Sequence, residues 1–183
     1  MEINKNISLK SYNTFGVEVS AKSFVEINSI EELKTVLTKN NQPLLTLGGG
    51  SNLLFTKDFE GLVVKNNLKG ITVVEENEEA VFLKVGAGEV WHELVLYCIA
   101  HNYAGIENLS LIPGNVGASP MQNIGAYGVE VKDVITEVEA MNLEDNTLRL
   151  FTNEACEFGY RSSIFKTREK DNYFITAVTF KLN

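Results

Sequence analysis

The sequence is poor in the residues that build disulfide-rich and metal-binding proteins. Its 183 residues include only two cysteines, three prolines and two histidines. Cys98 and Cys156 lack the CxxC or Cys/His spacing of a redox or zinc site. His92 and His101 have no second ligand at metal spacing, so they are interpreted as surface or packing residues. We expect reduced thiols and no metal site.

Positive charge is also scarce. Sixteen Lys and Arg residues stand against twenty-four Asp and Glu residues, which gives a formal net charge of -8. Such a chain repels a phosphate backbone, and no run of Lys or Arg provides a local exception. We therefore expect no nucleic-acid partner.

Long apolar runs are missing as well. The opening residues "MEINKNISLKSYNTF" contain no apolar core of the kind found in signal peptides. No apolar run approaches the ~20 residues that cross a bilayer as a helix. We expect no membrane partner, and a cytoplasmic location follows by default.

What the sequence does contain is 44% hydrophobic residues, enough for an ordinary core. After an irregular start, the expected strands of the first part cover residues 21–27, 43–47 and 61–65. Between the first two lies a helix, which Ser29 and Glu32 begin as a capping box. The order strand, helix, strand, loop, strand predicts a small α/β lobe with parallel pairing over residues 1–67.

The pattern of the second part predicts a larger lobe over residues 68–183. Short strands at residues 71–75, 80–88, 134–143, 147–152 and 172–182 are separated by turns or hairpins. Residues 89–102 form a helix with a broad apolar face that includes Val90 and Ile99. Asn153 is expected to cap a short helix. The predicted fold class is α+β, a small α/β lobe plus a larger, mainly antiparallel lobe.

The loop "LGGGSNLLF" follows an expected strand. Its consecutive glycines permit positive φ, so that backbone N–H groups can converge on an anion, and the neighbouring hydroxyl and amide add neutral donors. The residues concerned are Gly48, Gly49, Gly50, Ser51 and Asn52. No Lys follows as in a P-loop, and the Rossmann glycine pattern is absent. Two interpretations remain open, a tight structural turn and a phosphate cradle.

Residues 112–128, "IPGNVGASPMQNIGAYG", carry no charge. One interpretation is a loop and one helical turn that Ser119 caps before Pro120. However, long loops in compact domains tend to be functional. Backbone amides together with Ser119, Gln122, Asn123 and Tyr127 suit a flat heterocycle with polar edges.

A third stretch, "FGYRSSIFK" at residues 158–166, contains an arginine among hydroxyl groups. Arg161 offers a planar cation for a carboxylate, and Tyr160, Ser162 and Ser163 lie beside it in the sequence. The alternative interpretation is an ordinary surface arginine.

These three stretches, with "SYNTFGV" before them and "GAGEVWHELV" between them, closely resemble the UDP-N-acetylenolpyruvylglucosamine reductases of peptidoglycan synthesis over residues 8–182. The most specific parts are "GIENLSLIPGNVGASPMQNIGAYGVEV" and "FGYRSSIFK". The resemblance implies a two-lobed FAD-binding fold of the vanillyl-alcohol-oxidase-like type, in which both lobes hold extended FAD.

The resemblance also assigns the cofactor-binding residues. It implies that the loop from Gly48 to Asn52 holds the pyrophosphate of FAD. The flavin is expected to be lined by Ile112, Pro113, Gly114, Ala118, Ser119, Gln122, Asn123, Gly125 and Tyr127. The lack of charge there fits a ring that accepts and releases electrons, because a fixed charge would favour one redox state.

The chemistry that the resemblance implies has two half-reactions. NADPH reduces FAD, and the flavin then passes hydride to the enolpyruvyl ether of a UDP-sugar substrate, leaving an enolate that a serine protonates. Arg161 is the expected catalytic residue and pairs with the substrate carboxylate. Tyr160 is expected in the substrate site, and Lys166 has a supporting role.

The sequence departs from this family after its last strand. The family continues into a substrate-binding domain with the proton-donating serine and a glutamate, and neither motif is found here. Ser162 and Ser163 belong to the arginine motif and do not replace that serine. We expect the chain to bind FAD but to turn over substrate negligibly alone, with the missing domain as a candidate partner. Alternatives are a non-catalytic flavin-binding module, half of a split flavoenzyme, and an apo structural fragment.

Overall fold

The computed structural model describes residues 1–183, which divide into two compact units, Met1–Leu68 and Lys69–Asn183. Each unit has its own sheet. No helix has the length and apolar composition of a membrane span. The cofactor roles expected for lobes 1–67 and 68–183 stay predictions.

The first unit contains a four-stranded sheet in the order β1-β2-β4-β3. Its strands are β1 (Asn4–Ser8), β2 (Ser20–Ile27), β3 (Leu44–Leu47) and β4 (Phe59–Asn66), and a short 3-10 helix covers Lys10–Tyr12. The strand β4 pairs in parallel with both β2 and β3, which confirms the predicted parallel pairing. The expectation of an irregular start was wrong, because β1 pairs antiparallel with β2. Four of its five residues are exposed, so the sequence has no alternation of apolar and polar residues that would predict this edge strand.

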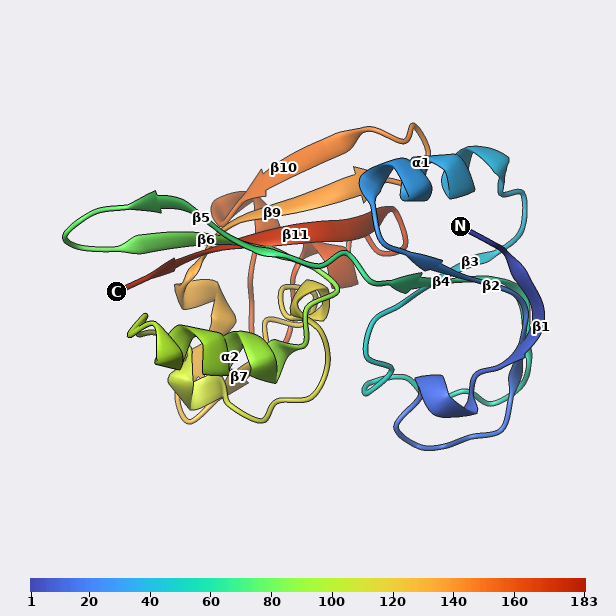
Figure 1. The fold of residues 1–183 in the computed structure, drawn as a ribbon, viewed down its shortest axis with the longest axis horizontal. Coiled ribbons are helices and arrows are strands. Elements are labelled where there is room, and N and C mark those ends of the chain that lie inside the picture. The colour runs from blue at the N-terminus through green and yellow to red at the C-terminus, as the bar shows by residue number, and fades with distance from the viewer. The chain divides into compact units, whose positions relative to one another are not determined.

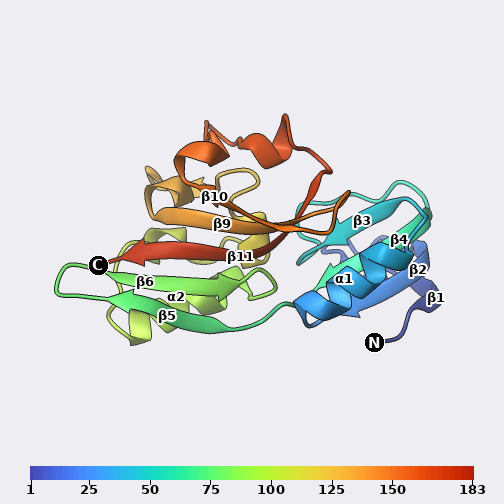
Figure 2. The ribbon, with the colours of Figure 1, turned by 90° about the horizontal axis from the view of Figure 1, so that it is seen from above.

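The helix of this unit, α1 (Ile30–Lys39), lies along one face of the sheet (Figure 2). It begins as predicted, because the Ser29 hydroxyl oxygen accepts a hydrogen bond from the backbone N–H of Glu32 at 3.2 Å. In a capping box the Glu32 carboxylate would accept from the N–H of Ser29. It accepts instead from the N–H of Asn28, one residue earlier, at 2.8 Å. Leu33 and Val36 are buried against the sheet, which anchors the helix.

The second unit contains a five-stranded sheet in the order β10-β9-β11-β6-β5 (Figure 1). Its strands are β5 (Ile71–Glu76), β6 (Val81–Gly86), β9 (Ile135–Asn142), β10 (Leu148–Thr152) and β11 (Tyr173–Leu182). All its pairings are antiparallel, as predicted. The short strands β7 (Gly125–Ala126) and β8 (Val129–Glu130) form a separate hairpin. Five 3-10 helices cover Glu107–Leu109, Val116–Ala118, Val131–Asp133, Glu154–Cys156 and Ile164–Lys166.

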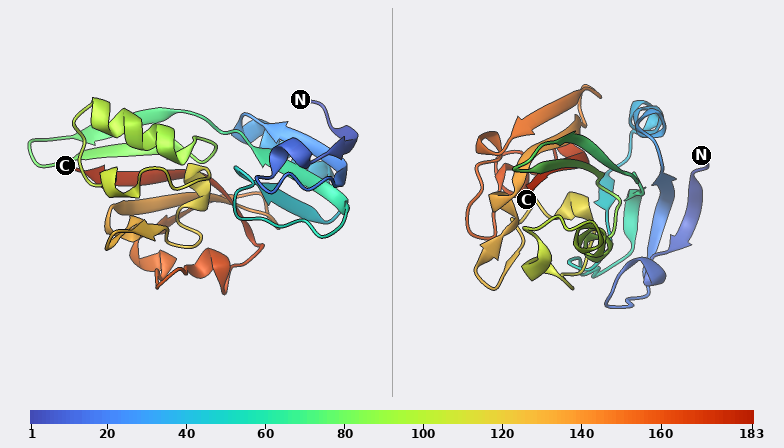
Figure 3. Two further views of the ribbon diagram at one scale, coloured as in Figure 1. Left: turned by 90° about the horizontal axis from the view of Figure 1, so that it is seen from below. Right: turned by 60° about the vertical axis from the view of Figure 1, so that its left-hand side comes forward.

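One face of this sheet is covered by α2 (Trp91–Ala100), as two views show (Figures 1 and 3). The buried Trp91 indole donates a hydrogen bond to the carbonyl of Leu109 at 2.8 Å and packs edge-on against Phe180. Val90 and Ile99, expected on the buried face, are 43% and 52% exposed. Val90 is the N-cap with extended backbone, so helical periodicity does not place its side chain, and Ile99 lies in the last turn.

Two predicted helix caps are wrong. Asn153 has helical φ and ψ, and its side-chain amide donates to the carbonyls of Lys132 and Ile135 instead, both at 2.7 Å. The 3-10 turn after it is capped by the Thr152 hydroxyl oxygen, which accepts from the N–H of Ala155. The sequence assigned the Asn153 amide to the helix that follows it, although carbonyls more distant in the chain compete for the same donor.

Ser119 ends a helix instead of beginning one. It follows the 3-10 helix Val116–Ala118, and its hydroxyl donates to the carbonyl of Val116 at 2.7 Å. Turns, and no helix, follow Pro120. The dipeptide Ser-Pro therefore marks a chain reversal here.

Both cysteines are buried and unpaired, as predicted for reduced thiols. Burial raises the pKa of the Cys98 and Cys156 thiols from 9.0 to about 12, because desolvation disfavours the thiolate. Their contribution to stability is therefore complete below pH 9.0 and is lost as the pH rises from 9.0 toward about 12.

We expect the folded protein to resist Ellman's reagent at mildly alkaline pH and to react at both thiols once urea unfolds it. The thiolate is the reactive species, and it is suppressed in the folded state. Absorbance of the released thionitrobenzoate measures the reaction. Rapid labelling of two thiols in the native protein would contradict the burial of these residues.

Candidate functional site

The glycine loop after β3 has a conformation that requires glycine at one position. Gly50 has φ of +68°, and a Cβ at this residue would lie 1.9 Å from the backbone oxygen of Tyr12. The Gly50 carbonyl in turn accepts a hydrogen bond from the N–H of Thr14 at 3.2 Å. A left-handed backbone in close contact with another segment excludes any side chain here.

The structure adds a lysine to this loop that the sequence analysis missed. The Lys65 ammonium donates to the carbonyl oxygen of Gly48 at 2.7 Å. A P-loop has its lysine directly after the glycines, whereas this lysine comes from the neighbouring strand. Parallel pairing of Leu47 with Lys65 brings it to the loop, and that register was the available signal.

These contacts fit an anion at the loop. The carbonyl oxygens of Gly48 and Gly50 both accept hydrogen bonds from the protein, from Lys65 and Thr14. Their partial negative charges are therefore neutralised in part and repel an anion less. No acidic residue lies between Gly48 and Asn52, and a cation lies next to it. These contacts are compatible with a phosphate cradle and with a tight structural turn, and the role of the loop stays a prediction.

We expect Lys65→Met to weaken FAD affinity by about fivefold to tenfold, since a hydrogen-bonded charge near an anion contributes roughly 1 kcal/mol. Flavin fluorescence titration measures the affinity. The matched control is Lys22→Met, which removes a lysine of the same unit that is paired with Glu60 on the surface. Equal losses in both variants would mean that Lys65 acts only through net charge.

The uncharged segment of the second unit is anchored by its main chain. The carbonyl of Gly114 accepts from the N–H of Trp91, and the N–H of Gly117 donates to the carbonyl of Ala87 at 2.9 Å. A Cβ on Gly117 would lie 2.6 Å from the Cβ of Ala87, so a glycine is required for this close approach. The sequence analysis did not single out Gly117. The segment is thus fixed at the connection between β6 and α2.

The predicted flavin-lining residues differ widely in exposure. Six are half-buried or exposed along the segment, namely Ile112, Pro113, Gly114, Ala118, Gln122 and Gly125. Ser119 and Asn123 are buried, and both side chains are hydrogen-bonded within the protein. Tyr127 is 90% exposed, at the turn between β7 and β8. Contact of these residues with a cofactor stays a prediction.

The arginine motif forms a tight turn. Gly159 and Ser162 exchange two backbone hydrogen bonds, at 3.0 and 3.2 Å, which places Tyr160 and Arg161 at the tip. Tyr160 is 89% exposed, and Arg161 has a left-handed φ of 52°. The Lys166 ammonium donates to the Arg161 carbonyl at 3.0 Å, so it supports the turn.

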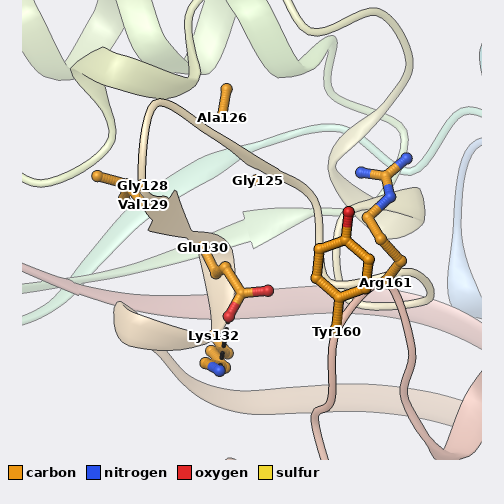
Figure 4. A pocket seen from close by; sticks show the side chains of 8 residues that line it. All are labelled: Gly125, Ala126, Gly128, Val129, Glu130, Lys132, Tyr160 and Arg161. Carbon is orange, nitrogen blue, oxygen red and sulfur yellow. Dashed lines mark ion pairs between the residues drawn. The ribbon is translucent and has the colours of Figure 1, made fainter.

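This turn faces the β7–β8 hairpin across an open cleft of about 710 Å³ (Figure 4). The lining residues are Gly125, Ala126, Gly128, Val129, Glu130, Lys132, Tyr160 and Arg161. The Arg161 guanidinium also donates to the side-chain oxygen of Gln122 at 3.2 Å. The fold therefore brings together the uncharged segment and the arginine motif, which lie far apart in the sequence.

The charges of the cleft leave one cation available. The Glu130 carboxylate is paired with the Lys132 ammonium at 2.6 Å, and this hydrogen bond raises the pKa of Lys132 above its ordinary value. Arg161 belongs to none of the ion pairs within its unit. A guanidinium with no carboxylate partner beside a cleft can bind an external carboxylate.

The comparison with known families identifies the class of protein as one that binds a flavin dinucleotide. The chain belongs to the FAD binding domain family, whose sequence pattern matches residues 21–150. FAD is accordingly its cofactor, and the neutral glycine loop and the uncharged segment fit such a group. Membership of this family does not depend on the role of any single residue.

The similar proteins that have been named are reductases of one kind. The chain is 52% identical to UDP-N-acetylenolpyruvoylglucosamine reductase of Flavobacterium johnsoniae and 47% identical to that of Bacteroides fragilis. It is also similar to the crystal structure of the same reductase from Thermus caldophilus, with a TM-score of 0.80 and 30% identity. That match covers 100% of this chain and 63% of the other.

The chain spans about half the length of the curated relatives that it matches. The two alignments above cover 100% and 99% of this chain, but only 54% and 55% of the relatives. The similarity in fold and sequence is therefore to the FAD-binding part of a larger protein. The activity of that larger protein is a separate question.

Proposed function

We propose that this chain is the FAD-holding part of an enzyme that reduces UDP-N-acetylglucosamine enolpyruvate to UDP-N-acetylmuramate with NADPH, for cell-wall synthesis. The reductase relatives support the reaction. The observation that carries the proposal is the Arg161 guanidinium, which lies at a cleft beside the uncharged segment without a carboxylate partner. An enolpyruvyl substrate carries the carboxylate that such a group recognises.

In this proposal two uncharged segments hold the cofactor. The loop from Gly48 to Asn52, with Lys65 behind it, holds the pyrophosphate. The segment from Ile112 to Tyr127 lies along the flavin. FAD bound there would supply the redox chemistry that links NADPH to the substrate. The protein's part is to hold both groups in place and to stabilise charge.

Arg161 stabilises the negative charge that develops on the substrate carboxylate. Its guanidinium has five N–H donors in a plane, and one edge is held by Gln122. The rest of the plane is left for two parallel hydrogen bonds to a carboxylate. Tyr160, next to it and almost fully exposed, contacts the substrate from the same turn.

The protonating group is proposed to lie outside this chain. The Ser163 hydroxyl donates to the carbonyl of Met121 at 2.7 Å and is buried. Ser162 lies within the arginine turn itself. Since the relatives are nearly twice as long, a further domain or a separate partner is the natural source of this serine.

A second candidate function is a flavin-binding module without reductase activity, or half of a split flavoenzyme. It is favoured by two exposed aromatic rings, because Tyr160 at the cleft and Tyr127 on the β7–β8 turn are 89% and 90% exposed. An aromatic pair of this kind suits contact with a partner chain. A carrier of electrons alone, however, has no use for the unpaired Arg161.

The test begins with the chain purified in the presence of FAD. We expect a perturbed flavin absorption spectrum that survives desalting, together with negligible UDP-N-acetylmuramate formation by the chain alone. Complete loss of flavin on desalting would contradict the binding sites. Turnover at the rate of a full-length reductase would contradict the need for a further domain. Normal turnover only after addition of a second chain would favour the split enzyme.

A further inference from the structure

Asn123 is the point at which three segments of the second unit meet. Its side chain is fully buried, and its backbone has φ of 44°, which asparagine tolerates better than most residues. The amide nitrogen donates to Glu130 Oε1 and to the carbonyl of Gly159, both at 3.0 Å. The amide oxygen accepts from the N–H of Lys132 at 3.1 Å.

These bonds leave no N–H of this side chain for a ligand. An asparagine amide has two N–H donors, and both are directed at protein acceptors. Asn123 was predicted to bind the cofactor, and its neighbour Gln122 does point at Arg161. Contact of the Asn123 backbone with the cofactor stays a prediction, whereas its buried amide is built into the frame that joins the uncharged segment to the arginine turn.

The bond to Gly159 reaches the base of that turn. Gly159 is the first residue of the turn and bonds to Ser162, so fixing its carbonyl fixes the two residues between them. Arg161 itself has left-handed φ, a conformation that costs a residue with a side chain about 1 kcal/mol. Such a conformation persists only where the surroundings enforce it. Asn123 is part of those surroundings.

We propose that Asn123 is a positioning residue, which holds the arginine turn against the uncharged segment and thereby directs the Arg161 guanidinium into the cleft. The inference rests on the proposed function, because it takes Arg161 to be the carboxylate-binding group. Asparagine suits the position for two reasons. Its amide donates two hydrogen bonds and accepts one, and it tolerates the left-handed backbone. An aspartate would turn an acceptor toward Glu130 and toward the Gly159 carbonyl.

The test compares the wild-type chain with Asn123→Gly, both loaded with FAD. Glycine keeps the left-handed backbone and removes only the amide. The probe is 2-methoxyacrylate, a small enol ether that carries a carboxylate, and its methyl ester is the uncharged control. NMR of the Arg161 side-chain N–H reports probe binding, and flavin fluorescence reports FAD affinity.

We expect Asn123→Gly to bind 2-methoxyacrylate about tenfold more weakly than the wild type, the loss typical of a misplaced charged hydrogen-bond donor. FAD affinity should change less than about twofold, since both N–H donors of the amide are already bound to protein acceptors. A purely structural role would lower both affinities together. The methyl ester should bind neither protein.

The matched control is Asn153→Ala. It removes two side-chain hydrogen bonds in the same unit, which Asn153 donates to the backbone carbonyls of Lys132 and Ile135, both at 2.7 Å. Neither bond involves a residue of the arginine turn. We expect this variant to unfold at lower urea concentration but to bind the probe as the wild type does. Equal weakening in both variants, or unchanged probe affinity in Asn123→Gly, would overturn the inference.

Failure of the proposed function gives a different result. If the wild-type chain does not bind the probe at all, the role of Arg161 in carboxylate binding is wrong. The positioning of the turn is then decided by hydrogen exchange at the Ser162 amide, which donates to Gly159. Faster exchange in Asn123→Gly but not in Asn153→Ala supports it, and unchanged exchange overturns it.

Discussion

Arg161→Ala is expected to lower kcat about a hundredfold to a thousandfold while FAD affinity stays unchanged, because one well-placed donor to a developing charge contributes about 2.7–4 kcal/mol. The guanidinium lies at the cleft and belongs to no ion pair of its unit, so its charge is available to an external carboxylate such as that of the proposed substrate. The assay follows NADPH oxidation in a chimera of this chain with the rest of the Flavobacterium johnsoniae relative.

Two further variants sharpen this result. Arg161→Lys keeps the charge but loses the planar pair of donors, so an intermediate loss is expected. Arg168→Ala removes an exposed arginine of the same unit that is paired with Glu157, and it should leave kcat unchanged. A loss of FAD binding that parallels the loss of kcat in Arg161→Ala would show that Arg161 is structural.

Gly50→Ala is expected to have the largest effect on the first unit. The new Cβ would lie 1.9 Å from the Tyr12 carbonyl oxygen, and φ of +68° is unfavourable for alanine. Strain and overpacking together should cost about 2–5 kcal/mol. We expect FAD binding to be lost as well, because relief of the contact moves the loop. Urea unfolding and flavin fluorescence measure the two effects.

Gly16→Ala separates the two causes. Gly16 has φ of +63°, close to that of Gly50, but nothing lies within 4 Å of its added Cβ. It therefore reports the backbone cost alone, about 1 kcal/mol, and should leave FAD binding intact. If both variants lose the same stability, the close approach of Tyr12 contributes nothing, and the loop is less constrained than its geometry indicates.

The regular elements of both sheets could be predicted because their signals are local. A hairpin pattern located β9 and β10, apolar alternation located β11, and the capping serine Ser29 located the start of α1. The edge strand β1 was missed because four of its five residues are exposed, which leaves no apolar pattern. Asn153 was assigned to a cap because its actual acceptors lie 21 and 18 positions away in the chain. Ser119 was assigned to a cap because a serine before a proline is compatible with a helix start as well as with a turn.

The sequence predicted which residue types form the candidate site, but not which of these residues are hydrogen-bonded to one another. The neutral loop and the arginine motif are visible in the sequence as unusual compositions. That Lys65 lies against Gly48, and that Asn123 binds Gly159, are contacts between residues 17 and 36 positions apart. The first depends on the parallel register of β3 and β4, and the second on the packing of two turns.

The sequence by itself determined the α+β class, the segments with freedom of backbone and without charge, and the presence of an arginine suited to a carboxylate. Only the tertiary structure decided which polar groups are already occupied and which face a cleft. A hydrogen bond is assigned by distances of a few tenths of an ångström, which depend on how strands and turns pack. Residue types fix what a side chain can bind, whereas packing fixes what it does bind.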